Sequence, residues 1–242
     1  MDDKVNNMNE DYYKAYEKRY SQVYEKNMMW SASEYTPDVI TFLKTYNITK
    51  NNKILDLGCG EGRDAIHLLR QGYNLLAVDY SNTVIEMCNK LTDNKYKNNF
   101  MQFDLISDEM NETFDFIYSI AVLHMFVTEE HRNKFLSFVR KHLNKDGKCL
   151  ICVLGDGEKE SVSDINDAFK NTKRKVMNND TEIEIATTSC KIVNWQTLEN
   201  EIKRNNLIIV NKWISNKIPE FNSSMCVVVK RGVKEDGFSM AE

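Results

Sequence analysis

The sequence predicts an α/β fold with a doubly wound, mostly parallel seven-stranded sheet. Two observations lead to this prediction: apolar stretches of strand length alternate with segments of helical periodicity, and short turns separate them. Such alternation implies right-handed crossovers and a parallel sheet that helices cover on both faces. The last two expected strands have no helical pattern between them, which predicts an antiparallel edge strand.

The seven expected strands are short apolar stretches that end at turn residues. The first covers residues 53–57 (KILDL), with two asparagines before it and a glycine-rich turn after it. The remaining strands are expected at 74–79, 99–103, 114–120, 148–154, 207–213 and 225–230.

The helices are expected where apolar residues recur at helical spacing between these strands. Residues 64–71 form one such segment, and Gly72 is a natural stop for it. Ser81 is a suitable N-cap for the next helix, because its hydroxyl can accept a hydrogen bond from a first-turn amide. Residues 128–143 have apolar residues at helical spacing over a long segment, which predicts a helix there. A last helix is expected around Leu198, before the sixth strand.

Two segments lie outside this alternation. Residues 1–46 are expected to form an N-terminal helical cap, and residues 47–242 the sheet domain. Within that domain, the polar and charge-rich segment 155–194 is expected to form an insertion on the substrate side, as a lid.

Composition excludes several classes of protein. The 242 residues are 42% hydrophobic and 28% charged, which is an ordinary globular balance. No stretch approaches the roughly 18 consecutive apolar residues of a membrane span, so no membrane association is expected. The net charge of −4 argues against a nucleic-acid partner, because such surfaces need clustered positive charge. No export signal opens the chain and its six cysteines fit no disulfide framework, which predicts reduced thiols and a cytoplasmic protein.

The segment with the most chemical information is ILDLGCGEGR, residues 54–63. It follows a strand and opens a helix, which is where a glycine-rich turn lets a ligand approach the backbone. A dinucleotide-binding turn has its third glycine where this chain has Arg63. Asp56 and Glu61 would repel a pyrophosphate but not a ligand that carries an ammonium group. The turn therefore favours a cofactor that is positive where NAD is negative.

This pattern resembles the first motif of the class I S-adenosylmethionine-dependent methyltransferases. The likeness is greatest to small-molecule enzymes of bacterial type, in which Gly-Arg-Asp-Ala often follows the turn. It continues at Asp79, which ends the second strand, at residues 103–105 (FDL) after the third, and at residues 119–124 (SIAVLH) after the fourth. The resemblance implies a Rossmann-like methyltransferase fold, with S-adenosyl-L-methionine as the cofactor and S-adenosyl-L-homocysteine as the product.

The resemblance also implies roles for residues at the strand ends. An acid at the position of Asp79 binds the two ribose hydroxyls, and one at Asp104 lies near the adenine amino group. Asp104 is otherwise interpreted as a turn residue, and Arg63 either pairs with a carboxylate or is a solvated side chain. The cofactor-binding residues implied in this way are Tyr20, Asp56, Gly58, Cys59, Gly60, Arg63, Asp79, Tyr80, Asp104, Leu105, Ser119, Ile120 and His124.

Four side chains are candidates for contacts with the reacting groups. His124 follows the fourth strand, where a neutral imidazole would either accept the proton of the nucleophile or simply line the pocket. Tyr16 and Tyr20 belong to a tyrosine stripe that either packs as an amphipathic face or closes over the cofactor and substrate. Tyr20 is thus a second catalytic candidate, and Trp30 is a candidate wall of the substrate pocket.

No metal site is expected. Cys149 and Cys152 have the spacing of a zinc or redox pair, but they fall within an expected strand. Residues three apart in a strand point to opposite faces, so core packing is the favoured interpretation.

The sequence therefore predicts a methyltransferase that moves a methyl group by in-line displacement to a small-molecule acceptor. Two alternatives stay open: an RNA or protein methyltransferase, and a non-catalytic, methyltransferase-like subunit that binds the cofactor.

Overall fold

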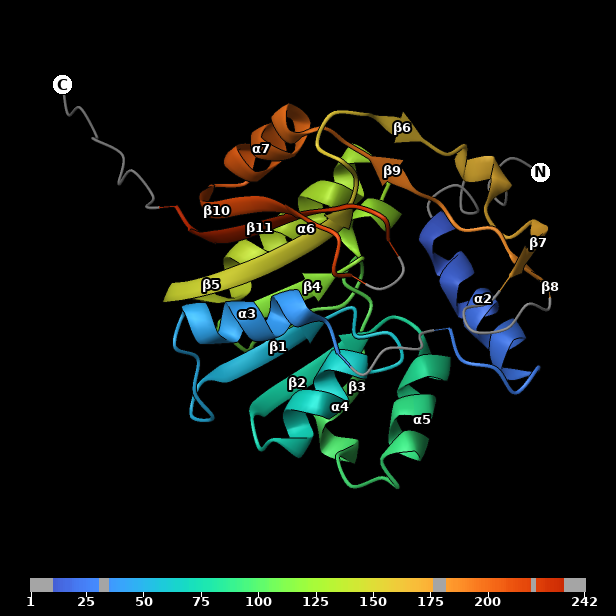
Figure 1. Ribbon diagram of the computed structural model, residues 1–242, viewed down its shortest axis with the longest axis horizontal. Helices are drawn as coiled ribbons and strands as arrows, with labels where there is room; N and C mark the ends of the chain where they lie inside the picture. Colours follow the sequence, from blue (N-terminus) through green and yellow to red (C-terminus); the bar gives the residue numbers. More distant parts are fainter. Residues whose placement is uncertain (1–10, 31–34, 176–181, 219–220, 233–242) are drawn as a thin grey trace.

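The computed structural model describes residues 11–30, 35–175, 182–218 and 221–232. A seven-stranded sheet forms its centre (Figure 1). In the order in which they lie across the sheet, the strands are β10 (Leu207–Ser215), β11 (Ser224–Arg231), β5 (Leu143–Leu154), β4 (Phe114–Ile120), β1 (Lys53–Leu57), β2 (Asn74–Asp79) and β3 (Phe100–Gln102).

The strand directions confirm the predicted fold class. Strands β1 to β5 run parallel, whereas β11 pairs antiparallel with both β5 and β10, so the antiparallel pairing lies at one edge. Strand β5 begins earlier than the expected residue 148, because residues 144–147 form an irregularity opposite Asp115. Strand β1 lies between β2 and β4, which makes its carboxyl end the point where the winding of the sheet reverses.

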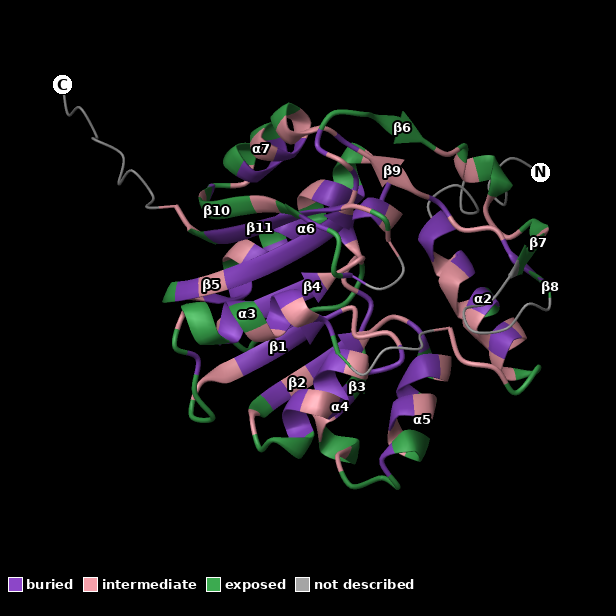
Figure 2. Cartoon of the chain, viewed as in Figure 1, coloured by how far each residue is buried: buried purple, intermediate pink, exposed green. Residues whose placement is uncertain are grey.

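Helices cover both faces of the sheet. On one face lie α3 (Pro37–Thr45), α4 (Arg63–Arg70) and α5 (Asn82–Leu91), whose apolar side chains share a buried cluster with the strands. On the other face lie α6 (Glu129–His142) and α7 (Trp195–Arg204), which belong to a second buried cluster. Figure 2 shows buried residues along the strands between these two layers.

The two neighbouring cysteines of β5 confirm this arrangement. Cys149 belongs to the cluster beneath α6 and α7, and Cys152 belongs to the cluster beneath α3, α4 and α5. Both are free thiols and fully buried. The residues therefore point to opposite faces, as the spacing predicts, and serve as core residues.

Side-chain caps begin three of the sheet-covering helices. The hydroxyl of Ser81 accepts a hydrogen bond from the Val84 amide at 3.2 Å, which confirms the predicted cap of α5. Thr128 accepts from the His131 amide at 3.3 Å at the start of α6, and Asn194 accepts from the Thr197 amide at 2.9 Å at the start of α7. Each cap satisfies one of the otherwise unpaired amides of a first helical turn.

Two segments lie outside the three layers, beyond the carboxyl ends of β1 and β4 (Figure 1). The first consists of the 3₁₀ helix η1 (Tyr12–Lys14) and α2 (Ala15–Tyr24). The second is the expected insertion, in which β6 pairs with β9 and β7 pairs with β8, both antiparallel. Its elements are β6 (Ser161–Val162), η4 (Ile165–Asp167), β7 (Asn171–Lys175), β8 (Glu182–Ala186) and β9 (Lys191–Ile192).

Helix α2 and the insertion are packed against each other. Val23 lies in a buried cluster with Ile183 and Ile185 of β8. Hydrogen bonds join the same elements, because Arg19 Nε donates to the Ala186 carbonyl at 2.9 Å and the Ala186 amide donates to a Gln22 side-chain oxygen at 2.6 Å. A segment from the start of the chain and one from its second half thus form a single layer over the strand ends.

The expected division at residue 46 stays a prediction. Helix α3 shares the buried cluster on one face of the sheet, and Tyr12 and Tyr13 of η1 share the cluster on the other face, whereas Val23 of α2 packs with the insertion. Residues 1–10 of the expected cap lie outside the described residues. Across the ranges that the structure describes, no helix is both long enough and apolar enough to cross a membrane.

Candidate functional site

The glycine-rich turn joins β1 to α4. Gly58, Gly60 and Gly62 have φ angles of +83°, +51° and +71°, which L side chains rarely adopt. At Gly58 an added Cβ would also collide with the side chain of Val122, which follows β4. The turn therefore needs glycine both for its backbone conformation and for its close approach to the β4 loop.

Asp56 lies beneath this turn. It is 3% exposed, and its carboxylate accepts a hydrogen bond from the Tyr118 hydroxyl at 3.0 Å. Burial, reinforced by the nearby charge of Asp64, raises the pKa of Asp56 well above its usual range. A cationic ligand group nearby would stabilise the ionised form of this buried carboxyl group.

Asp79 ends β2 beside the turn. Its Oδ2 accepts from the Gly60 amide and its Oδ1 from the Ser81 amide, both at 2.9 Å. Desolvation raises the pKa of Asp79 to about 6, although these two hydrogen bonds favour the charged form. The carboxylate thus has a fixed orientation at the wall of the cavity, where it can accept hydrogen bonds from a ligand's hydroxyl groups.

Asp104, which follows β3, is held by the N-terminal segment. The Tyr13 hydroxyl donates to its two carboxylate oxygens at 3.2 and 2.9 Å, and the Ile106 amide donates to Oδ1 at 2.9 Å. Burial and the hydrogen bond to Asp104 raise the pKa of Tyr13 far above that of a free tyrosine. This end of the cavity is therefore closed by a contact between η1 and the sheet.

His124 lies in the 3₁₀ helix η3 (Leu123–Met125), directly after β4. It is 5% exposed and packs edge-on against Phe221, with 5.5 Å between ring centroids. Its Nδ1 is buried and has no hydrogen-bond partner within the described part of the chain. Burial, together with the charge of Arg132, lowers the pKa of His124 to about 4. The imidazole is therefore neutral near pH 7 and can accept a hydrogen bond from a ligand.

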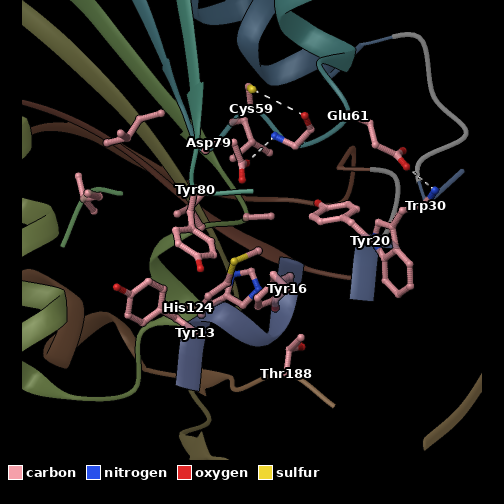
Figure 3. A pocket seen from close by; sticks show the side chains of 18 of the residues that line it. Tyr13, Tyr16, Tyr20, Trp30, Cys59, Glu61, Asp79, Tyr80, His124 and Thr188 are labelled. Atoms are coloured by element: carbon pink, nitrogen blue, oxygen red, sulfur yellow. Dashed lines mark hydrogen bonds between the residues drawn. The ribbon is translucent and has the colours of Figure 1, made fainter. Parts of the chain in front are cut away.

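Helix α2 supplies the facing wall. An added Cβ at Gly60 would lie 3.2 Å from the Tyr20 hydroxyl, so this tyrosine sits directly over the turn. Burial, with the charges of Asp79 and Glu61 nearby, raises the pKa of Tyr20. The backbone amide of Trp30 donates to Glu61 at 2.6 Å, which holds the segment after α2 against the turn. Figure 3 shows these aromatic side chains facing the strand ends.

A cavity of about 500 Å³ unites these groups. All but one of the sequence-predicted site residues line it, although they come from β1, β2, β4, η3, the turn that opens α4, the loops after β2 and β3, and α2 with the segment after it. The lining includes Tyr16, Tyr20, Trp30, Asp56, Gly58, Cys59, Gly60, Arg63, Asp79, Tyr80, Asp104, Leu105, Ile120 and His124.

Ser119 is the predicted site residue that the structure does not bring to the cavity. It is 1% exposed, and its hydroxyl donates to the Leu57 carbonyl at 2.7 Å. Ser119 and Ile120 are adjacent in β4, so they point to opposite faces of the sheet. The contact with Leu57 links β4 to β1, which is a structural role.

Several cavity residues were not predicted from the sequence. Arg19 lies between Tyr16 and Tyr20, which are predicted site residues, but a charged residue in an amphipathic helix is ordinarily expected to face solvent. Arg174 and Thr188 come from the insertion, and Phe221 from the connection between β10 and β11. No local motif marks these residues, because only the fold brings their segments over the strand ends.

Within the described ranges, no group of three or more histidine, cysteine, aspartate or glutamate side chains is arranged to hold a metal ion.

Comparison with known families gives one match that covers most of the chain. The family model described as "Tellurite resistance protein TehB" matches residues 12–203. Among curated proteins, the chain is 31% identical over 100 residues to the probable S-adenosyl-L-methionine-dependent methyltransferase TehB of Haemophilus influenzae. That match covers 41% of this chain and 35% of the relative, so the chain matches about a third of that relative's length.

A longer alignment and a solved structure extend the similarity. The ubiquinone biosynthesis O-methyltransferase of Rickettsia felis is 26% identical over 196 residues, which cover 74% of this chain and 78% of the relative. The fold is similar to that of 1,6-didemethyltoxoflavin-N1-methyltransferase from Burkholderia thailandensis, with a TM-score of 0.70 and 14% identity. That alignment covers 93% of this chain and 90% of the other, whose structure contains 1,6-didemethyltoxoflavin and S-adenosylhomocysteine.

Proposed function

Because the chain belongs to the TehB family, we propose that it is an S-adenosylmethionine-dependent methyltransferase acting on a small-molecule acceptor. One observation carries the proposal: a single cavity brings together the glycine-rich turn, Asp79 and His124. A binding wall for a nucleoside and a place for an acceptor thus share one cavity.

The residues of this cavity suit the cofactor. We propose that Asp79 accepts hydrogen bonds from the two ribose hydroxyls, and the Gly60 and Ser81 amides that orient its two oxygens support this role. The carboxylates of Asp79 and Glu61 make the strand-end wall negative, which suits a sulfonium and an ammonium, and such a cation would favour the ionised form of the buried Asp56. Tyr80 and Leu105 lie beside Asp104, and we assign the adenine to this part of the cavity.

When bound, S-adenosylmethionine supplies a methyl group activated by a positively charged sulfur. The task of the protein is to hold the nucleophile in line behind that methyl and to exclude water. We propose that residues 1–46 and the insertion 155–194 act as cap and lid for this purpose. The packing of α2 on β8 supports the proposal, because it closes these two segments into one layer over the strand ends.

His124 and Tyr20 are the polar groups proposed to act near the reacting atoms. The neutral imidazole of His124 has a free acceptor or donor position at Nδ1, which would orient a protic nucleophile by a hydrogen bond. A pKa of about 4 makes it a weak base, so orientation is the role that we propose for it. Tyr20, whose raised pKa keeps it protonated, is proposed to donate a hydrogen bond.

The acceptor is proposed to be a small molecule and not RNA or a protein. Cap and insertion enclose the cavity from the side opposite the strand ends, which leaves room for a compact acceptor. We further propose a cytoplasmic location, since all six cysteines are free thiols and thiols persist in that compartment.

Two measurements test the proposal. Isothermal titration with S-adenosylhomocysteine, and with NAD as a control ligand, should give binding for the former and none for the latter. Transfer of a radiolabelled methyl group from S-adenosylmethionine to pools of small metabolites, with tRNA and protein pools in parallel, then tests turnover. Binding without transfer to any pool would favour the non-catalytic alternative, and labelling of RNA or protein alone would contradict the small-molecule assignment.

A further inference from the structure

Arg19 of α2 is a buried cation that faces the cavity. It is 5% exposed and lines the cavity wall opposite the strand ends. Its Nε donates to the Ala186 carbonyl at 2.9 Å, which fixes the plane of the guanidinium. Its Nη2 is buried and has no hydrogen-bond partner among the described residues. A buried donor without an acceptor costs free energy, and a guanidinium that lines a cavity can recover that cost by binding a ligand there.

A second arginine lies close by. Arg174 of β7 lines the same cavity, and its charge contributes to the lowered pKa of Arg19, of which burial is the larger cause. Within the parts of the chain that the structure describes, no ion pair joins either arginine to a carboxylate. Two cations that repel each other across a cavity wall would be stabilised by an anion between them.

Charge is therefore separated across the cavity. The wall built by the strand ends and α4 carries the five carboxyl groups of the lining, together with Arg63. The wall built by α2 and β7 carries Arg19 and Arg174. The first wall suits a cationic cofactor, whereas the second suits an acceptor with a negative group.

Aromatic rings flank the first guanidinium. Arg19 lies 5.3 Å from the Tyr16 ring centroid and 5.2 Å from the Trp30 ring. Tyr16 in turn forms a side-chain hydrogen bond with Thr188 of the insertion. Flat apolar surfaces beside a planar donor suit a carboxylate attached to an organic body, which would stack on the rings, better than a compact inorganic anion.

We propose that Arg19 and Arg174 form a carboxylate-binding subsite that holds the anionic end of an organic acceptor, with Tyr16 and Trp30 against its body. The proposal rests on the proposed function, since it names the class of acceptor for that same cavity. It also gives the insertion a role in specificity, because Arg174 belongs to β7.

The test uses the full chain saturated with S-adenosylhomocysteine. Benzoate and its neutral counterpart benzamide are titrated while the ¹⁵N-labelled Arg19 side-chain Nε–H resonance is followed, assigned by its loss in Arg19→Lys. We expect benzoate to shift this resonance and to bind about tenfold or more tightly than benzamide, since a hydrogen bond to a charged group contributes ~1.5–3 kcal/mol. Equal binding of the two probes, or no shift with either, would overturn the proposal.

Matched variants locate the effect. Arg19→Met and the rim variant Arg174→Gln should each remove most of the preference for benzoate, measured by calorimetry. Lys18→Met is the control, because Lys18 is the adjacent residue of α2 and its exposed ammonium donates to the Phe169 carbonyl outside the cavity. A preference that survives in both arginine variants, or that Lys18→Met reduces equally, would contradict the proposal.

Two further arms identify the source of the anion. 5′-Methylthioadenosine lacks the amino-acid end of the cofactor. If Arg19→Met weakens the binding of S-adenosylhomocysteine but not that of 5′-methylthioadenosine, then Arg19 binds the cofactor's own carboxylate and the acceptor assignment is wrong. If sulfate shifts the Arg19 resonance at lower concentration than benzoate, the site prefers a compact inorganic anion and the proposal fails. Failure of the wild type to bind S-adenosylhomocysteine would instead contradict the proposed function itself.

Discussion

Arg132 of α6 and Glu201 of α7 form a buried, bidentate ion pair beside the loop that carries His124. Arg132 Nε and Nη2 donate to the two carboxylate oxygens of Glu201 at 2.7 and 2.6 Å. Its Nη1 donates to the Leu123 carbonyl at 2.8 Å and to the Phe126 carbonyl at 3.3 Å. One guanidinium thus connects two helices to both ends of the His124 loop, which makes Arg132 a positioning residue for the cavity.

Arg132→Met should lower the free energy of unfolding by ~3–5 kcal/mol, because Glu201 would remain buried without its partner. It should also lower kcat for methyl transfer more than it raises the KM for the cofactor, since the loop loses its two carbonyl contacts. Urea denaturation and steady-state kinetics measure the two effects.

The control is Arg204→Met, which removes an ion pair between the same two helices. Arg204 and Glu129 are paired at 2.7 Å on the surface, with side chains 57% and 64% exposed. Exposed pairs contribute at most ~1 kcal/mol, so this variant should stay close to wild type in stability. Equal losses from the two variants would contradict the role assigned to the buried pair.

Asp79→Ala should weaken the binding of S-adenosylhomocysteine tenfold or more, because a hydrogen bond to a charged group contributes ~1.5–3 kcal/mol. Asp79→Asn keeps one acceptor oxygen for the Gly60 or Ser81 amide and should lose less affinity than the alanine variant. Calorimetry measures both. Asp146→Ala, at an exposed position of β5, is the control and should keep the affinity of the wild type. Unchanged affinity in Asp79→Ala would refute the ribose assignment.

Gly58→Ala should reduce both stability and cofactor affinity, because the new methyl group would collide with Val122 at the cavity wall. The matched control is Gly72→Ala, since Gly72 has a similar φ of +87° but only Lys50 atoms, at 3.6 Å or more, near an added Cβ. The control should lose only the ~1–3 kcal/mol of backbone strain and keep its affinity. Thermal unfolding with and without cofactor separates the loss of stability from the loss of affinity. Similar affinity losses in Gly58→Ala and Gly72→Ala would contradict the predicted steric effect.

His124 should make stability depend on pH. Its pKa is about 4 in the folded protein and about 6.5 in an unfolded chain, so between these values only the unfolded state takes up the proton. Its contribution to stability therefore falls as pH decreases from 6.5 to 4, by up to ~3 kcal/mol.

The measurement is the difference in unfolding free energy between wild type and His124→Gln across pH 4 to 7. This comparison is needed because Asp79, with a pKa raised to about 6, acts in the opposite direction below that pH. The stability of the wild type relative to the variant should decrease as the solution is acidified. A difference that does not vary with pH would show that His124 is not desolvated as described.

Much of the fold was predictable because its signals are local. Strand β1 is a short apolar stretch between turn residues, Ser81 is a good N-cap, and Gly58 and Gly60 occupy a turn that favours glycine. The acids at strand ends follow the same logic, since parallel strands in a doubly wound sheet bring their carboxyl ends to one edge. Asp79 and Asp104 therefore line the cavity as expected.

The remaining features depend on contacts between distant segments. Ser119 follows the expected pattern in the sequence, but its hydroxyl donates to the Leu57 carbonyl. Its neighbour Ile120 lines the cavity instead, because adjacent residues of a strand point to opposite faces. Arg19 is buried beneath β8, to which its Nε donates, and Arg174 reaches the cavity from the strand pair β7–β8.

The doubly wound sheet and the acid-flanked turn at its centre follow from local patterns of residues, because hydrophobic period, caps and glycine positions act over a few residues. The burial of Arg19 in the cavity wall and the contacts that hold the His124 loop depend instead on the folded chain. Those properties arise from burial, and burial is set by the segments that pack together, here α2 with β8 and α6 with α7.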